Sequence, residues 1–164
     1  MVKPAAKYVL LTGSNLGDRE HMLNSAAAMI EKEIGSILKT SSIHETEAWG
    51  FESQDLFLNQ AILVQSVLSP FEILNKIHQI ESELGRVRQT EQWVSRVIDI
   101  DILCSNQVSL NTDVLSIPHS RLHERHFALA PLCEIVPNWV HQCKGKDYQQ
   151  LLDEVTDLHS IQAK

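Results

Sequence analysis

Hydrophobic runs and helical repeats alternate in the first half of the chain. The apolar run Tyr8–Thr12 predicts a buried strand, and Gly13–Gly17 behind it has turn chemistry. A helix is predicted next, with Gly35 at its end, because five hydrophobic residues recur at helical spacing: Leu23, Ala26, Ala27, Ile30 and Ile34. Further strands are predicted at Ile37–His44 and Leu58–Leu68. The polar loop between them is long enough to be functional and holds Trp49, Gly50 and Gln54.

A second helix has a clear start signal. Ser69 is a suitable N-cap, Pro70 fits the first helical position, and Glu72 completes a capping box. Gly85 is placed to stop this helix. Its predicted buried stripe is Phe71, Leu74, Ile77 and Leu84.

The last third mixes both kinds of element. Val97–Leu103 alternates like a strand, and Val108–Leu110 is predicted to pair with it as a hairpin. Helices are predicted at Phe127–Ile135, interrupted by Pro131, and at Tyr148–Leu158. This order of elements predicts an α+β or α/β fold with helices packed on a central sheet, in a single domain over residues 1–164.

Composition and charge narrow the function. The chain has 164 residues, is 43% hydrophobic, and has no apolar run near the roughly 20 residues that cross a bilayer, so we expect no membrane span. Its three cysteines form no C-x-x-C pair, which favours a reducing cytoplasm over a disulfide framework. The net charge of -7 weighs against nucleic acid as a partner. Local arginine groups instead indicate a small polyanionic ligand; they are Arg86, Arg88 and Arg96, then Arg121 and Arg125.

Asp99 and Asp101 are the first candidate site. Residues two apart in a strand face the same side, so the two carboxylates project together while their isoleucine neighbours face the core. A few carboxylates, completed by waters and phosphates, are what Mg²⁺ prefers. The plain alternative is a half-exposed strand whose polar face happens to hold two aspartates.

Other side chains support a phosphate site. Arg86, Arg88 and Arg96 precede the aspartates in a loop with Trp93, and metal carboxylates and guanidinium groups are expected around the same phosphates. A solvated charged loop is the alternative. His119 with Arg121 and Arg125 forms a further cluster, whereas a zinc site lacks recognised ligand spacing; its ligands would be His119, His123, His126 and Cys133. Three aromatic residues could stack on a flat heterocycle or simply fill the core: Trp49, Phe57 and Phe127.

Taken together, these residues resemble the 6-hydroxymethyl-7,8-dihydropterin pyrophosphokinase family from Tyr8 to about Tyr148. The motifs that carry the resemblance are Gly13-Ser-Asn-Leu-Gly17, Phe57-Leu-Asn59, Glu81-x-x-x-Gly85-Arg-x-Arg88, Arg96-x-x-Asp99-Ile-Asp101-Ile-Leu103 and Ile117-Pro-His119 followed by Arg125-x-Phe127. Each motif is weak alone, but their order and spacing are specific.

The resemblance implies a monomeric ferredoxin-like fold, in which helices flank a mostly antiparallel sheet, and transfer of diphosphate from ATP to the pterin in folate biosynthesis. It implies that Asp99 and Asp101 bind two Mg²⁺ ions and that Arg86 and Arg96 belong to a loop that closes over the transferring group. ATP contacts are implied for Arg88, Arg96, His119 and Arg125, with Glu81 and Ile102 nearby. Pterin contacts are implied for Thr46, Trp49, Phe57, Asn59 and Phe127.

The chain departs from the usual family pattern at five positions, which puts the closed loop geometry and ATP affinity in question more than the reaction: Glu47, Gln89, Gln92, Val94 and Ser120. Two rival functions stay open. Magnesium-dependent nucleotidyltransferases also combine a Gly-Ser turn with a D-x-D strand, but their turn lies close before the aspartates, and Gly13 is far from Asp99. A non-catalytic binding module, for RNA for example, is disfavoured by the acidic charge.

Overall fold

The computed structural model describes residues 3–47, 56–85, 97–156 and 161–163. Its helices are α1 (Arg19–Glu33), α2 (Pro70–Glu83), α3 (His126–Ile135) and α4 (Tyr148–Glu154), with a 3-10 turn η1 (Leu122–Glu124). The main sheet holds β1 (Ala6–Ser14), β2 (Ser36–Thr40), β3 (His44–Thr46), β4 (Phe57–Ser66), β5 (Asp99–Ser105) and β10 (Ile161–Ala163). Two small hairpins pair β6 (Leu110–Asn111) with β7 (Ser116–Ile117) and β8 (Val140–His141) with β9 (Lys146–Asp147).

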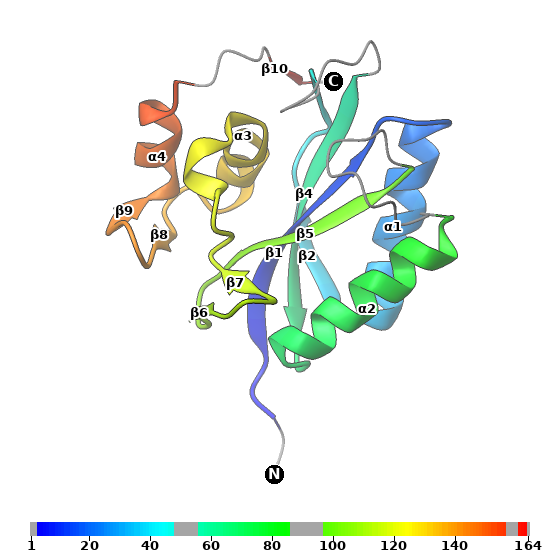
Figure 1. Ribbon diagram of the computed structural model, residues 1–164, viewed down its shortest axis with the longest axis horizontal. Helices are drawn as coiled ribbons and strands as arrows, with labels where there is room; N and C mark the ends of the chain where they lie inside the picture. Colours follow the sequence, from blue (N-terminus) through cyan, green and yellow to red (C-terminus); the bar gives the residue numbers. More distant parts are fainter. Residues whose placement is uncertain (1–2, 48–55, 86–96, 157–160, 164) are drawn as a thin grey trace.

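The main sheet separates two layers of helices. Its strand order is β10-β3-β4-β1-β5, β2 also pairs with β4, and every pairing among the described strands is antiparallel. Helices α1 and α2 cover one face, and α3 and α4 lie on the other (Figure 1). Successive residues of a strand face opposite layers, so Leu10 belongs to the core under α1 and α2 while Val9 and Leu11 belong to the core under α3 and α4.

Local signals explain the elements that the sequence predicts well. The Asp18 side chain caps α1 by accepting the His21 N–H at 3.1 Å. Ser69 and Glu72 form the predicted capping box of α2, and Gly85 ends that helix with a φ of 96°. Gly35 follows α1 and is required by close packing, because a Cβ there would lie 2.1 Å from the backbone oxygen of Gln65 in β4.

The predicted strand Ile37–His44 is two strands. β2 and β3 pair with different parts of β4, and Ser41 between them keeps one backbone bond to that strand, from its N–H to the Ala61 carbonyl at 2.9 Å. The Ser41 hydroxyl accepts the Ala61 N–H at 2.9 Å and so replaces a backbone partner there. The predicted pairing of Val108–Leu110 with the Asp99 strand is also wrong, since β6 pairs with β7 and β5 pairs with β1.

Three helix details differ from the prediction. Phe71 is 46% exposed, and the residues of α2 that face the sheet are Ile73, Ile77, Ile80 and Glu81. Helix α3 runs through Pro131 without interruption, because that buried ring costs one hydrogen bond while the rest of the helix packs on the sheet. Helix α4 ends at Glu154 rather than Leu158, and Val155 has extended backbone angles.

Candidate functional site

Asp99 and Asp101 lie on the same face of β5, as the alternation predicts. Both side chains are half-buried, while Ile98, Ile100 and Ile102 between and around them are buried in the core under α1 and α2. β5 pairs with β1, so Asp99 lies opposite Gly13 and Asp101 opposite Leu11. The two carboxylates therefore belong to the face of the sheet that α3 covers.

The antiparallel register joins the aspartates to the predicted heterocycle site. Gly13 pairs with Asp99 on one side and with Asn59 of β4 on the other. Since neighbouring strands lie about 4.8 Å apart, Asn59 and Asp99 are about 10 Å apart across the sheet and face the same way. Gly13, between them, leaves this row open because it has no side chain.

Asn59 is held in a fixed orientation. Its side chain is buried, and its Nδ2 donates to the Thr46 hydroxyl of β3 at 3.2 Å. Phe57 pairs with Thr46 one step along the same face. A Cβ at position 13 would lie only 2.8 Å from Asn59 Oδ1, so the absence of a side chain at Gly13 fits the placement of this amide.

His119 is a neutral imidazole with a defined tautomer. Its Nδ1 accepts the Arg121 N–H at 3.1 Å, which leaves the proton on Nε2. Its own backbone N–H donates to the Leu103 carbonyl of β5 at 2.8 Å and so ties the segment to the aspartate strand. Burial, followed by the charge of Arg125, lowers the pKa of His119 to about 4, although the Asp99 carboxylate acts in the opposite direction.

Arg125 and Phe127 come to the site at the first turn of α3. The Arg125 guanidinium carbon lies 5.6 Å from the centroid of the Phe127 ring. Burial lowers the pKa of Arg125, while the charges of Asp101 and Asp99 raise it, so a cation lies within electrostatic reach of both carboxylates. The start of α3 thus brings a guanidinium and an aromatic ring to the edge of the aspartate pair.

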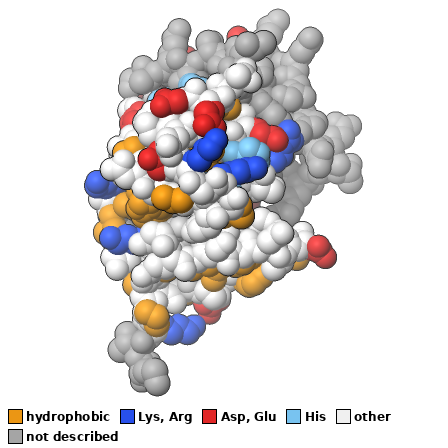
Figure 2. Space-filling view, turned by 90° about the vertical axis from the view of Figure 1, so that its left-hand side faces the viewer, with side chains coloured by type: hydrophobic (Ala, Val, Ile, Leu, Met, Phe, Trp, Pro, Cys, Tyr) orange, Lys and Arg blue, Asp and Glu red, His pale blue; other side chains and the backbone are white. Residues whose placement is uncertain are grey.

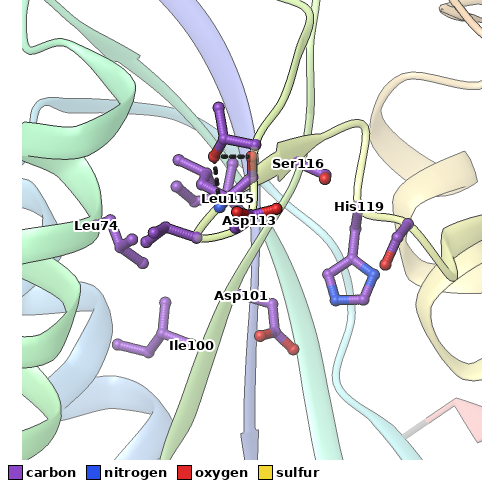
Figure 3. Close-up of a pocket in the computed structure, with 11 residues that line it drawn as sticks. Leu74, Ile100, Asp101, Asp113, Leu115, Ser116 and His119 are labelled. Atoms are coloured by element: carbon purple, nitrogen blue, oxygen red, sulfur yellow. Dashed lines mark hydrogen bonds between the residues drawn. The ribbon is translucent and has the colours of Figure 1, made fainter.

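A pocket of about 270 Å³ opens beside Asp101. Figure 3 shows the carboxylate of Asp101 and the imidazole of His119 on one side, with Leu74 and Ile100 on the other. Thr112 and Leu115 are joined by hydrogen bonds at its rim, drawn as dashed lines. The remaining lining residues are Ile102, Asp113, Val114, Ser116 and Ser120. Of these remaining lining residues, the sequence identified Ile102 and Ser120 but not the others, because they come from separate short segments with no motif of their own.

Glu81 lies behind the aspartates rather than beside them. Its side chain is 3% exposed, and its Oε2 accepts the Ile100 N–H at 3.0 Å, so α2 caps a backbone donor of β5. Four predicted site residues lie outside the described part of the chain: Trp49, Arg86, Arg88 and Arg96. The same holds for Trp93 and for three of the departures from the family pattern, Gln89, Gln92 and Val94.

The carboxylates of Asp99 and Asp101 are the kind of donor that magnesium prefers. Among the described residues, no three His, Cys, Asp or Glu side chains are grouped as metal ligands, so His119, His123, His126 and Cys133 do not form the alternative zinc site. Two carboxylates on one strand match an ion that keeps waters and substrate oxygens in its shell. Within the same part of the chain, no helix is long and apolar enough to cross a membrane.

The surface around η1 carries both signs of charge. Figure 2 looks onto the left-hand side of Figure 1 and shows charged and histidine side chains gathered on its upper half. At η1, Arg121 and Glu124 form an ion pair, with 3.2 Å between Nε and Oε2. Cations next to carboxylates suit a small ligand that carries phosphates and a metal better than they suit a nucleic-acid backbone.

Comparisons with known proteins identify the family. Residues 9–137 match the family model for 7,8-dihydro-6-hydroxymethylpterin-pyrophosphokinase. The chain is 46% identical over 129 residues to the 2-amino-4-hydroxy-6-hydroxymethyldihydropteridine pyrophosphokinase of Bacillus subtilis, covering 78% of this chain and 76% of that protein. It is 40% identical over 151 residues to the protein of that name from Aquifex aeolicus, covering 92% and 93% respectively.

Solved structures agree on the fold. A crystal structure of Plasmodium falciparum HPPK-DHPS aligns with a TM-score of 0.74 and 17% identity over 93% of this chain, which spans 43% of that longer chain. Another HPPK-DHPS structure, in complex with substrates, aligns with a TM-score of 0.73 and 18% identity over 92% of this chain and 43% of that one. The antiparallel sheet with flanking helices is therefore the predicted ferredoxin-like fold. With a family model matched over most of its length and relatives at 40–46% identity, the chain belongs to the 7,8-dihydro-6-hydroxymethylpterin-pyrophosphokinase family.

Proposed function

We propose that this pyrophosphokinase of folate biosynthesis works across the row Asn59–Gly13–Asp99, with the pterin at the Asn59 end and the ATP phosphates at the Asp99 end. The enzyme transfers diphosphate from ATP to the hydroxymethyl group of 6-hydroxymethyl-7,8-dihydropterin. The reaction breaks the bond from the β-phosphorus to the oxygen bridging it to the α-phosphorus and forms a bond from the β-phosphorus to the hydroxymethyl oxygen. It releases AMP and the proton of the hydroxyl group. The single observation that supports this layout is the strand register. It puts Asn59 of β4 and Asp99 of β5 on the same face of the sheet, on either side of Gly13 in β1.

The pocket beside Asp101 is the proposed nucleoside site. Leu74, Ile100 and Leu115 supply apolar walls for a flat base, and hydroxyls at the rim can meet a ribose. The Nε2–H of neutral His119 can donate to a phosphate or ribose oxygen. Further ATP contacts are proposed for Arg88, Arg96, Ile102 and Arg125, with Glu81 holding β5 behind them.

Asp99 and Asp101 are the proposed ligands of magnesium, with two ions expected. Bound magnesium supplies neutralisation of the phosphate charge and orientation of the attacking oxygen. The carboxylates themselves are held by the alternation of β5, which keeps both on one face at a spacing of about 7 Å. The Arg125 guanidinium, and the proposed catalytic groups of Arg86 and Arg96, place positive charge where negative charge develops on the transferring group.

The pterin site is proposed between Phe57 and Phe127. Two aromatic rings suit a flat heterocycle, and the Asn59 amide can both donate and accept along the edge of a pterin. Its Nδ2–Thr46 bond leaves Oδ1 and the second N–H of the amide to be satisfied by the ligand or by backbone groups. Trp49 is proposed as a further contact.

We also propose that residues 1–164 act as one catalytic domain, as a monomer, in the cytoplasm. One continuous sheet with a core on each face supports the single domain. The three cysteines are free thiols, which supports a reducing compartment.

Product analysis tests the proposed function. The chain is incubated with ATP, Mg²⁺ and 6-hydroxymethyl-7,8-dihydropterin, and the products are separated and identified. We expect equal amounts of AMP and the pterin diphosphate. Release of pyrophosphate would instead favour the nucleotidyltransferase alternative, and no ATP turnover would favour a binding module.

A further inference from the structure

A polar cluster outside the predicted site joins β3 to α3. The Glu134 carboxylate of α3 accepts the Ser42 backbone N–H at 2.8 Å and the Ser42 hydroxyl at 2.7 Å, and it also bonds Nε2 of His44. Partial burial opposes ionisation of this carboxyl, but the bonds from Ser42 and His44 outweigh it and lower the pKa of Glu134. One ionised side chain thus holds two residues of the neighbouring segment.

The cluster is not a hydrolytic triad. In such a triad the base uses one ring nitrogen for the nucleophile and the other for the carboxylate. Here Nε2 of His44 meets both Glu134 and the Ser42 hydroxyl, the latter at 3.4 Å, and the Ser42 hydroxyl is already engaged by Glu134. A proton cannot be relayed through this arrangement, which leaves a positioning role.

On the strand side, the cluster lies next to Asn59, the proposed pterin contact. His44 is 5% exposed and pairs directly with Asn59 across β3 and β4. Thr46, the next residue on the same face of β3, accepts the Asn59 side-chain bond. A shift of β3 therefore moves the groups that orient Asn59.

On the helix side, Glu134 lies in the same helix as Phe127, the proposed pterin contact. Glu134 lies seven residues after Phe127 in α3, nearly two turns of a 3.6-residue helix, so both side chains are on the same face. Helix α3 packs on β3 and β4, and Phe127 is part of its contact with the sheet. Anchoring Glu134 therefore limits how far the first turn of α3 can move from Phe57 and Asn59.

We propose that Glu134, Ser42 and His44 are positioning residues that set the gap between Phe127 and the strand carrying Phe57 and Asn59. This inference rests on the proposed pterin site between those residues. Removing the Glu134 carboxylate widens the space between Phe127 and the strand that carries Phe57 and Asn59. It leaves the pocket at Asp101 and His119 intact, since those residues lie on β5 and the segment before η1.

The test compares Glu134→Ala with Glu134→Gln, and with Glu154→Ala as a matched control. Glu154 also bonds a neighbouring side chain, Lys146 at 2.8 Å, but on the exposed surface of α4. We measure the KM for 6-hydroxymethyl-7,8-dihydropterin and for ATP, kcat, and the Tm of each variant.

We expect Glu134→Ala to raise the pterin KM by about tenfold, equivalent to about 1.4 kcal/mol, with the ATP KM changed less than twofold. Glu134→Gln keeps an acceptor for the Ser42 N–H and is expected to recover part of that loss. A Tm that falls while both KM values stay at wild type would overturn the proposal, as would equal rises in both. If Glu134→Ala does not fold, Ser42→Ala and Glu134→Gln are judged by the same split between the two KM values. A wild-type chain that does not turn over the pterin would instead refute the proposed function.

Discussion

Replacing Gly13 by alanine tests the row of residues that crosses the sheet. The new methyl would lie 2.8 Å from Asn59 Oδ1, whereas ordinary contact begins at 3.4 Å. The Asn59 amide must therefore retreat by about 0.6 Å, and its 3.2 Å bond to Thr46 leaves little slack. Gly13 does not have a positive φ, so alanine fits the backbone.

The expected result is a loss of pterin binding in a folded protein. A shifted Asn59 amide no longer meets the edge of the pterin. A buried hydrogen-bonding group left without its ligand partner costs about 1–3 kcal/mol of binding free energy, so we expect a rise in pterin KM between about fivefold and about 150-fold. The ATP KM and the Tm should stay near wild type. Steady-state rates of AMP formation, with each substrate varied while the other is saturating, separate the two KM values.

Gly35→Ala is the matched control, because the same methyl would there lie 2.1 Å from a backbone oxygen of β4. Backbone cannot retreat as a side chain can, so this variant should lose stability rather than pterin affinity. A well-folded Gly13→Ala with an unchanged pterin KM would refute the reasoning about Asn59. Parallel rises in both KM values would equally contradict it.

Two further predictions concern the neighbours of the aspartates. Burial and the charge of Arg125 lower the pKa of His119 from 6.5 to about 4. As the pH falls, the imidazole therefore takes up its proton in the unfolded chain before it does so in the folded protein. The contribution of neutral His119 to the free energy of unfolding is complete above pH 6.5 and is lost between pH 6.5 and 4. His119→Gln should lose less stability than wild type over that range in urea titrations, and equal losses would show that His119 does not titrate this way. Glu81→Leu removes the acceptor of the buried Ile100 N–H and should cost about 1–3 kcal/mol of unfolding free energy, while Glu81→Gln, which keeps an acceptor oxygen, should cost less. Equal losses for the two Glu81 variants would mean that the hydrogen bond is not what Glu81 contributes.

The sequence predicted best where the signal is local. The capping box at Ser69 and the alternation around Asp99 each specify their own geometry within a few residues. The predicted stripe of α2 was right at Ile77 and wrong at Phe71, because Phe71 and Ile73 both fit a helical period and only the sheet decides which side is buried. That choice also buries Glu81, whose charge gives no hint in the sequence that it faces inward.

The site was predictable as a set of residues but not as an arrangement. Motifs marked Asp99, Asn59 and His119, yet their juxtaposition depends on strand register, which no single segment encodes. The contact of Glu134 with Ser42 spans 92 positions and carries no motif, so only the packed structure reveals it.

The central claim is that Asp99 and Asp101 support transfer of the β- and γ-phosphates together to the pterin. The most direct test uses ATP labelled at the β-phosphate and follows the label with wild type, Asp99→Asn, Asp101→Asn and the exposed control Asp153→Asn. We predict that wild type and the control place the label in the pterin diphosphate. Each site variant should slow this by more than about 100-fold, because several kcal/mol of charge stabilisation is lost. Label appearing in ADP or pyrophosphate, or near wild-type transfer by either site variant at saturating Mg²⁺, would contradict the account.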